Sequence, residues 1–76
     1  MKELLEVIAK RLVENPEQVS VTETENDRTL VLELKVAPED MGKVIGKQGR
    51  IAKAIRTVVK AAGVHEDKKI VVEIVQ

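Results

Sequence analysis

The stretch VIGKQGRIAKAIRTVVKAAG, residues 44–63, decides the fold of this chain of 76 residues. Its glycines Gly46 and Gly49 separate two segments that each have the residue pattern of a helix. The second segment predicts a helix over about 50–62, because the glycine that follows is a typical stop signal. The first segment predicts a helix over about 38–45, because a proline begins it and acidic residues in its first turn complement the helix dipole.

The predicted helix 50–62 places its side chains on two opposite sides. At about 100° per residue, one group of apolar residues projects within about 60°, and we expect it to pack on a sheet. That apolar stripe consists of Ile51, Ile55, Val58 and Ala62. A basic stripe lies roughly opposite, and we expect it to face solvent. The basic stripe consists of Arg50, Lys53, Arg56 and Lys60.

Outside this helical pair, the pattern predicts one more helix and three strands. Residues 2–14 carry one apolar stripe at helical spacing and end just before a proline. Alternating apolar residues predict a β-hairpin at 18–36. The last strand covers 69–75, and we expect it to lie parallel to 29–36 because the helical pair returns the chain. The fold class is therefore α+β, in the order α-β-β-α-α-β, with a three-stranded mixed sheet that carries three helices on one face.

The composition indicates one small domain, residues 1–76. Apolar residues make up 43% of the chain and none of them is aromatic. The chain has no cysteine, which excludes a disulfide scaffold and a thiolate metal site. No apolar run is long enough to cross a bilayer and no leader opens the chain, so we expect a cytoplasmic protein with no membrane partner.

The net charge of zero hides an uneven distribution of charged residues. Residues 1–40 hold ten acids and five bases, and residues 63–76 hold three acids and two bases. Residues 41–62, in contrast, hold six bases and no acid. This uneven distribution is a better guide to binding partners than the net charge. It indicates a basic surface around the two glycines.

The segment between Gly46 and Gly49 has the properties of a phosphate site. Glycines have no side chain, so another backbone can approach closely. The first amides of a helix have no internal partners and carry partial positive charge, which suits a phosphate. Lys47, Arg50 and Lys43 add full positive charges. The loop therefore suits a sugar–phosphate backbone.

The segment Val44–Gly49, followed by a helix, resembles the signature of KH domains, whose GXXG loop clamps about four backbone nucleotides. The element order resembles the type II KH arrangement. Residues 37–50 and the chain length are similar to the small bacterial KhpA (YlqC-type) family of RNA-binding proteins. The resemblance implies a non-catalytic protein that clamps single-stranded RNA and acts in post-transcriptional regulation, with single-stranded DNA left open as a second ligand.

The resemblance also implies which residues bind RNA, in a groove between the paired helices, their loop and a neighbouring strand. The residues that would hold the RNA backbone are Gly46, Lys47, Gln48 and Gly49. The residues that would add electrostatic attraction are Lys43, Arg50 and Lys53. The residues that would line the groove or fill the core are Ile45 and Ile55.

Two features limit base recognition by this chain. Many KH domains have isoleucine three residues after the second glycine, whereas this chain has Ala52, which leaves the lining of the base groove open. Stacking on aromatic side chains is excluded, so we expect modest affinity and loose sequence preference from one copy. The resemblance also implies how the affinity of a single copy could be raised. KhpA-like proteins dimerise with themselves or with a larger KhpB (Jag)-type partner, and two linked sites raise avidity.

Two other function classes stay open. One is a protein-interaction module whose fold chiefly makes a dimer, with RNA binding weak or supplied by the partner. The acidic first forty residues favour this alternative. The other is a ribosome-associated assembly factor, which would bind through the same loop and differ only in its target.

No set of residues predicts catalysis, a cofactor or a metal site. His65 is the only histidine and stands in a charged turn, where we expect it to be exposed. Ser20 has no base near it in sequence, and Glu39 and Asp40 are better explained as helix-start residues. The glycine spacing lacks the pattern of a nucleotide-binding phosphate loop. We therefore expect a protein that is not an enzyme.

Overall fold

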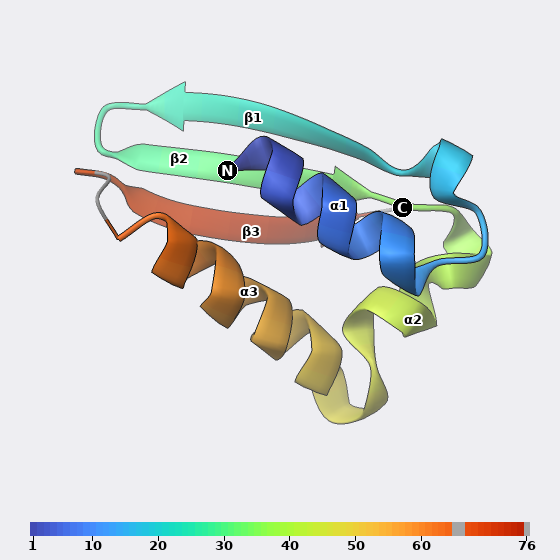
Figure 1. Cartoon of the computed structure of the whole chain (residues 1–76). Helices are drawn as coiled ribbons and strands as arrows, with labels where there is room; N and C mark the ends of the chain where they lie inside the picture. Colours follow the sequence, from blue (N-terminus) through green and yellow to red (C-terminus); the bar gives the residue numbers. More distant parts are fainter. Residues whose placement is uncertain (65–66, 76) are drawn as a thin grey trace.

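The computed structural model describes residues 1–64 and 67–75. Helices and strands in these residues follow the order that the sequence predicts (Figure 1). The elements are α1 (Lys2–Leu12), η1 (Pro16–Gln18), β1 (Ser20–Asn26), β2 (Thr29–Lys35), η2 (Pro38–Asp40), α2 (Met41–Ile45), η3 (Lys47–Gly49), α3 (Arg50–Ala62) and β3 (Lys69–Val75), where η marks a short 3-10 turn. The expected exposure of His65 falls outside the described residues.

The sheet has three strands in the order β1-β2-β3. β1 runs antiparallel to β2, with Val21 opposite Leu34, so the predicted hairpin is confirmed. β3 runs parallel to β2, with Val72 beside Leu32, because α2 and α3 carry the chain back to the end where β2 begins. The α+β class and the mixed sheet are therefore confirmed, and β3 is an edge strand.

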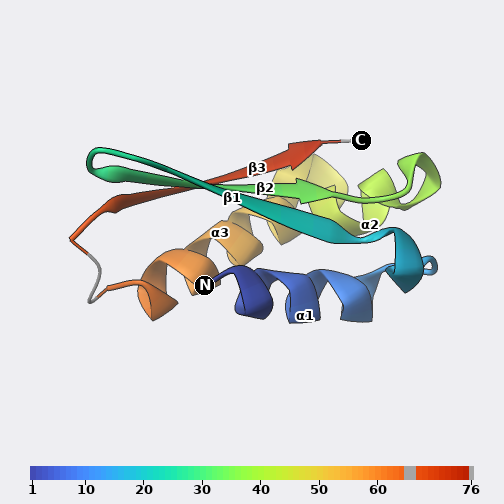
Figure 2. The same ribbon diagram turned by 90° about the horizontal axis from the view of Figure 1, so that it is seen from above.

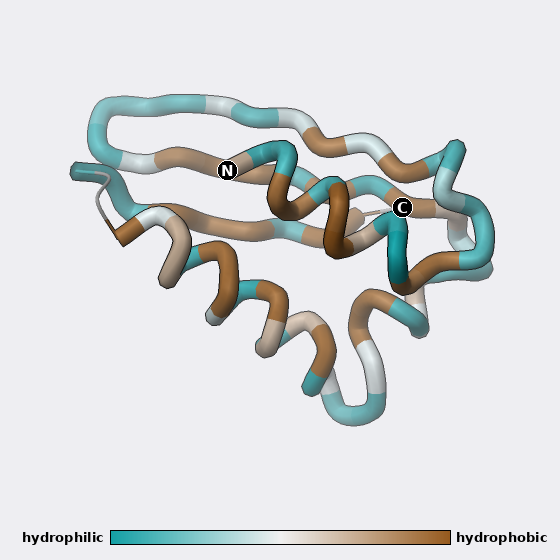
Figure 3. Tube along the Cα trace, in the orientation of Figure 1, coloured by the Kyte–Doolittle hydropathy of each residue, from teal (hydrophilic) through white to brown (hydrophobic). Residues whose placement is uncertain are grey.

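All three helices lie on one face of the sheet (Figure 2). The alternation of β2 and β3 turns their apolar side chains toward these helices, and the hydrophobic colour follows both strands in Figure 3. The core combines leucines of β2 with apolar residues of the other elements. Its buried members include Leu5, Ala9, Val21, Leu30, Leu32, Leu34, Val44, Ile55, Val59, Ile70 and Val72.

Two predicted boundaries are wrong by a few residues. α1 ends at Leu12 rather than at 14, and Val13 is already extended, with φ −97° and ψ 162°. The chain then forms η1 before β1 starts at Ser20, two residues later than predicted. Both shifts follow from Pro16, which cannot donate a backbone hydrogen bond and restricts the residue before it.

The predicted division of α3 into two sides is wrong in part. The residues that α3 buries against the sheet are Ala52, Ile55 and Val59. Val58, which we expected in that contact, is 48% exposed, and Ala62 is exposed as well. The reason is that α1 and α3 lie side by side on the sheet, so the apolar arc of α3 faces both the sheet and α1 (Figure 1).

Asp40 is the one charged side chain that the described residues bury completely. The backbone N–H groups of Glu14 and Asn15 donate to its carboxylate at 3.2 and 3.0 Å, and the Asn15 side-chain amide donates at 3.0 Å. These bonds fasten the segment that leaves α1 to the segment that enters α2. The sequence explains Asp40 only as a helix-start residue. The structure adds a contact between two distant segments, because the hydrogen-bond partners of Asp40 are 25 and 26 positions away in sequence.

The same contacts set the ionisation of Asp40. Burial raises the pKa of its carboxyl group, but the hydrogen bonds from Asn15 and Glu14 and the attraction of Lys43 favour the charged form and outweigh burial. The net result is a pKa below the ordinary value of about 3.9. Because the folded-state pKa is lowered, the carboxylate stabilises the fold above about pH 4. This contribution is lost as the pH falls through the folded-state pKa.

The turn between α2 and α3 depends on two glycines with positive φ. Gly46 has φ 76° and ψ 175°, and a Cβ atom there would lie 2.5 Å from Cγ1 of Ile51. Gly49 has φ 76° and ψ 14°, but a Cβ atom there would meet nothing within 4 Å. Gln48 between them also has a left-handed backbone, with φ 58°. Gly46 is thus required by backbone conformation and packing, and Gly49 by conformation alone.

We expect the substitution Asp40→Asn to destabilise the protein at neutral pH, because an amide replaces one of the two acceptor oxygens with a donor. When the pH drops below about 4, Asp40 takes up a proton and the free energy of unfolding of the parent should decrease. The difference between the parent and Asp40→Asn should therefore shrink on acidification. Urea unfolding between pH 3 and pH 7 measures this difference.

The exposed neighbour Glu39 provides the matched control. Glu39→Gln should change the free energy of unfolding by no more than about 0.5 kcal/mol at any of these pH values. A deficit of Asp40→Asn that stays constant with pH, or that appears equally in Glu39→Gln, would contradict the role given to the Asp40 carboxylate.

Three glycine-to-alanine substitutions should differ in sign and size. The Cβ atom that Gly42→Ala adds to α2 would meet nothing within 4 Å, so this substitution should stabilise the protein by roughly 0.5–1 kcal/mol. Gly49→Ala should destabilise it by roughly 1–2 kcal/mol, because alanine is strained at positive φ. Gly46→Ala should cost about 3 kcal/mol or more, since strain and the collision with Ile51 add. Thermal or urea unfolding ranks the three, and equal effects of Gly46→Ala and Gly49→Ala would contradict the packing role of Gly46.

Candidate nucleic-acid interface

The loop from Gly46 to Gly49 presents its two central side chains to solvent. Lys47 and Gln48 are exposed, and the N–H of Gly49 donates to the carbonyl oxygen of Gly46 at 3.2 Å, which closes the turn. The N-cap residue of α3 is Gly49, so no side chain caps the first amides of this helix. The predicted backbone-holding residues therefore form one exposed turn at an uncapped helix start, where an anion is favoured.

The predicted cations lie on both sides of this turn. Lys47, Arg50 and Lys53 are exposed, and none of them forms an ion pair within residues 1–64 and 67–75. Lys43 is already paired, because its ammonium nitrogen lies 3.5 Å from a carboxylate oxygen of Glu14. Three of the four predicted cations can thus contact a phosphate without first breaking an ion pair.

The sequence predicts that all four basic residues of α3 face away from the sheet. They do not all do so in the structure. The Nε–H of Arg56 donates to the carbonyl oxygen of Val72 at 3.3 Å, so Arg56 reaches the edge strand β3. Lys53 and Lys60 lie within about 60° of Arg56 around the helix axis. We call these three residues the basic flank of α3. It lies over the edge of β3, on the side of α3 away from α1.

The predicted groove isoleucines belong to the core. Ile55 is 4% exposed, and Ile45 is partly buried against the same core cluster. Ala52 is buried on α3, and its neighbour Ile51 packs over the backbone of Gly46. The position where many KH domains have isoleucine is therefore filled here by a small buried residue.

An apolar groove, which the sequence patterns did not predict, runs between α1 and α3. Its volume is about 570 Å³, and it is lined by Leu4, Ile8, Leu12, Arg50, Ile51, Ala54, Ile55 and Val58. Leu12 is 36% exposed and Val58 is 48% exposed at its surface. One sequence feature does indicate the groove. The apolar side of the helix predicted at 50–62 covers a wider arc than a contact with the sheet alone requires. We call this surface the apolar groove.

The described ranges, 1–64 and 67–75, contain no cluster of three or more histidine, aspartate or glutamate side chains that could hold a metal ion. They also contain no helix with the length and apolar character needed to cross a membrane.

Several curated proteins that are similar in sequence to this chain share one name. The chain is 69% identical over 75 residues to the RNA-binding protein KhpA of Clostridium perfringens, a match that covers 99% of this chain and 100% of the relative. It is 57% identical over 76 residues to the RNA-binding protein KhpA of Listeria monocytogenes, with full coverage of both chains. These matches extend from one end of the chain to the other.

Solved structures with the same fold are more distant in sequence. A crystal structure of Era in complex with MgGDPNP and nucleotides 1506–1542 of 16S ribosomal RNA matches with a TM-score of 0.64 at 22% identity. An Era structure from Aquifex aeolicus matches with a TM-score of 0.62 at 22% identity. Both matches cover 96% of this chain but only 28% of the Era chain, so they show a shared fold.

The family comparison agrees with the turn, the helices and the sheet described above. The family model described as "KhpA/KhpB, KH domain" matches residues 2–74, which is nearly the whole chain. The resemblance that begins with Val44–Gly49 is thereby confirmed. This chain belongs to the KhpA/KhpB family of KH domains.

Proposed function

We propose that this protein binds single-stranded RNA and holds its backbone in the loop from Gly46 to Gly49. The observation that carries the proposal is the exposed turn at the uncapped start of α3, flanked by the unpaired cations Lys47, Arg50 and Lys53. Its relatives are named RNA-binding proteins, which supports RNA as the ligand. The proposed role is post-transcriptional regulation in the cytoplasm, without catalysis.

The loop binds by electrostatics and hydrogen bonds rather than by stacking. Its amides and cations contact phosphates, which fix the position of a strand but carry little sequence information. The chain has no aromatic residue, so base stacking on aromatic rings cannot add affinity. The affinity should therefore fall with salt, with a slope of log K against log salt of about −0.7 per phosphate neutralised. Roughly two to four phosphates would contact one copy.

The apolar groove favours a second property, the formation of a dimer. Val58 and Leu12 leave apolar surface exposed along two adjacent helices, and Arg50 is the only charged residue in the lining. A two-fold dimer buries one surface against the same surface of a second copy, so a groove whose lining is apolar except for Arg50 fits such a pairing. We assign the groove to a second copy of this chain, and a KhpB-type protein would be the alternative partner.

The two surfaces lie mainly on different sides of α3, and they share one residue, Arg50, which flanks the loop and also lines the apolar groove. The apolar groove faces α1, whereas the basic flank lies over β3. A dimer through the groove would leave Lys47 and Gln48 of both loops free, because neither residue lines the groove. Two loops on one assembly would raise the avidity for a longer RNA without new contacts in either site.

The double substitution Lys47→Asp with Gln48→Asp tests the loop. It puts two negative charges where the proposal places a phosphate, so the affinity for single-stranded RNA should fall by at least about tenfold. The turn should stay folded, because both side chains are exposed. Fluorescence anisotropy with a labelled RNA measures the affinity, and circular dichroism checks the fold.

Lys2→Asp with Gln18→Asp is the matched control, since it changes the same residue types at exposed positions outside the loop. The control should retain most of the affinity of the parent. Unchanged RNA binding by the loop variant, or an equal loss in the control, would overturn the assignment of RNA binding to the loop.

The substitution Val58→Glu tests the dimer. A buried charge in an apolar interface is costly, so the dimer dissociation constant should rise by at least about tenfold. Thr57→Glu is the matched control, because Thr57 is exposed on α3 and does not line the groove. Light scattering over a range of concentrations measures the mass. A monomeric parent, or a dimer that survives Val58→Glu, would contradict the role of the groove.

A further inference from the structure

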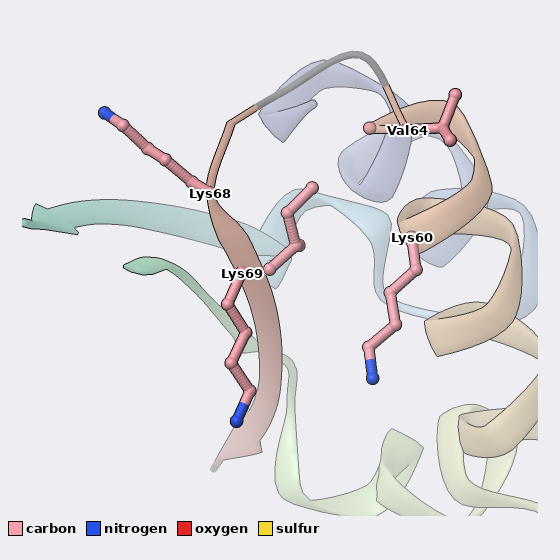
Figure 4. A pocket seen from close by; sticks show the side chains of 6 residues that line it. Lys60, Val64, Lys68 and Lys69 are labelled. Carbon is pink, nitrogen blue, oxygen red and sulfur yellow. The ribbon is translucent and has the colours of Figure 1, made fainter. Parts of the chain in front are cut away.

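A second hollow lies at the far end of α3 from the loop. Its volume is about 310 Å³, and it is lined by Lys60, Gly63, Val64, Lys68, Lys69 and Ile70. Figure 4 shows Lys60, from α3, and Lys69, from β3, extending their ammonium groups toward the same side, while Lys68 points away from them. We call this site the distal hollow. Nothing in the proposed role of the loop accounts for it.

The three lysines of the distal hollow differ in their partners. Lys68 forms an ion pair with Glu25, which explains its direction. Lys60 and Lys69 are exposed and form no ion pair with any residue in 1–64 or 67–75. Two cations that point the same way repel each other, and an anion between them removes the repulsion.

The apolar floor of the distal hollow depends on a close approach of α3 to β3. A Cβ atom on Gly63 would collide with Cδ1 of Ile70, so a larger residue at the helix end would force the Ile70 side chain to shift. Ile70 is buried at this contact. The cations Lys60 and Lys69 are exposed, whereas Gly63 and Ile70 of the same hollow are buried. This arrangement favours a small charged group held at the surface over a buried ligand.

The basic flank connects the distal hollow with the loop. Lys60 is ten residues after Arg50, which corresponds to about 15 Å along the helix axis. Lys53 and Arg56 lie between them on the same side of α3, and Arg56 contacts the edge of β3. A polyanion that leaves the loop along this side would meet a cation at about every turn of the helix until it reaches Lys60 and Lys69.

We propose that the distal hollow binds a phosphate of the same RNA strand whose backbone the loop holds. The inference rests on the proposed function, and it extends the RNA site along the whole of α3 and onto β3. A purely structural role explains the hollow less well. A lysine near a helix C-terminus stabilises the helix dipole, which would account for Lys60 but not for Lys69, which belongs to a strand.

The double substitution Lys60→Gln with Lys69→Gln tests the inference with RNA of two lengths. An oligonucleotide of about four nucleotides fills the loop alone, and one of about ten can also reach the distal hollow. The variant should bind the short RNA as the parent does. It should bind the long RNA roughly fivefold more weakly at 0.1 M salt, with a salt slope shallower by about 0.7, as for one lost phosphate contact.

Lys10→Gln with Lys35→Gln removes the same charge from exposed lysines outside the hollow and is the matched control. The control should bind both RNAs like the parent. Equal loss of long-RNA binding in the control, a loss of short-RNA binding in the variant, or no loss at all would overturn the inference alone. Failure of the parent to bind either RNA would overturn the proposed function, and the inference with it.

Inorganic phosphate distinguishes an RNA phosphate from a free one. In NMR spectra of the labelled parent, the long RNA should shift the amide resonances of Lys69 and Ile70. Inorganic phosphate at millimolar concentration should shift them much less. Equal shifts with phosphate and with RNA would overturn the assignment of the distal hollow to an RNA strand.

Discussion

The contact between Ile51 and the backbone of Gly46 fixes the turn on which the proposed RNA-binding surface depends. It holds the start of α3 against the end of α2, so that the two helices reverse direction over four residues. The reversal leaves Lys47 and Gln48 exposed and the first amides of α3 without a side-chain cap. On the other side of α2, the buried carboxylate of Asp40 fastens this helix to the end of α1. A rigid support thus carries an open loop.

α3 serves three surfaces at once. Ala52, Ile55 and Val59 pack on the sheet and hold the helix in place. The side that faces α1 is apolar and contributes Val58 to the groove, and the opposite side carries the basic flank over β3. The proposed dimer contact and the proposed RNA path therefore lie mainly on different sides of one helix, with Arg50 shared between them.

Much of this arrangement could be predicted from local sequence patterns. The alternation of Leu30, Leu32 and Leu34 predicts a strand with one buried face, and the spacing around Gly46 and Gly49 predicts the helix–loop–helix unit and its candidate phosphate site. The burial of Asp40, the apolar groove and the distal hollow could not be predicted in this way. Each depends on contacts between different elements, such as Asp40 with Asn15, α1 with α3 at the groove and Gly63 with Ile70, and no local period encodes such contacts.

The most direct test of backbone binding by the loop is NMR titration of the isotopically labelled chain with single-stranded RNA of about four nucleotides, the length that a GXXG loop holds. The amide resonances of Gly46 to Gly49 and of the first turn of α3 should shift most, and the shifts should weaken as salt is added. Largest shifts along the apolar groove, or a loop whose resonances do not move at saturation, would contradict a loop that holds the RNA backbone.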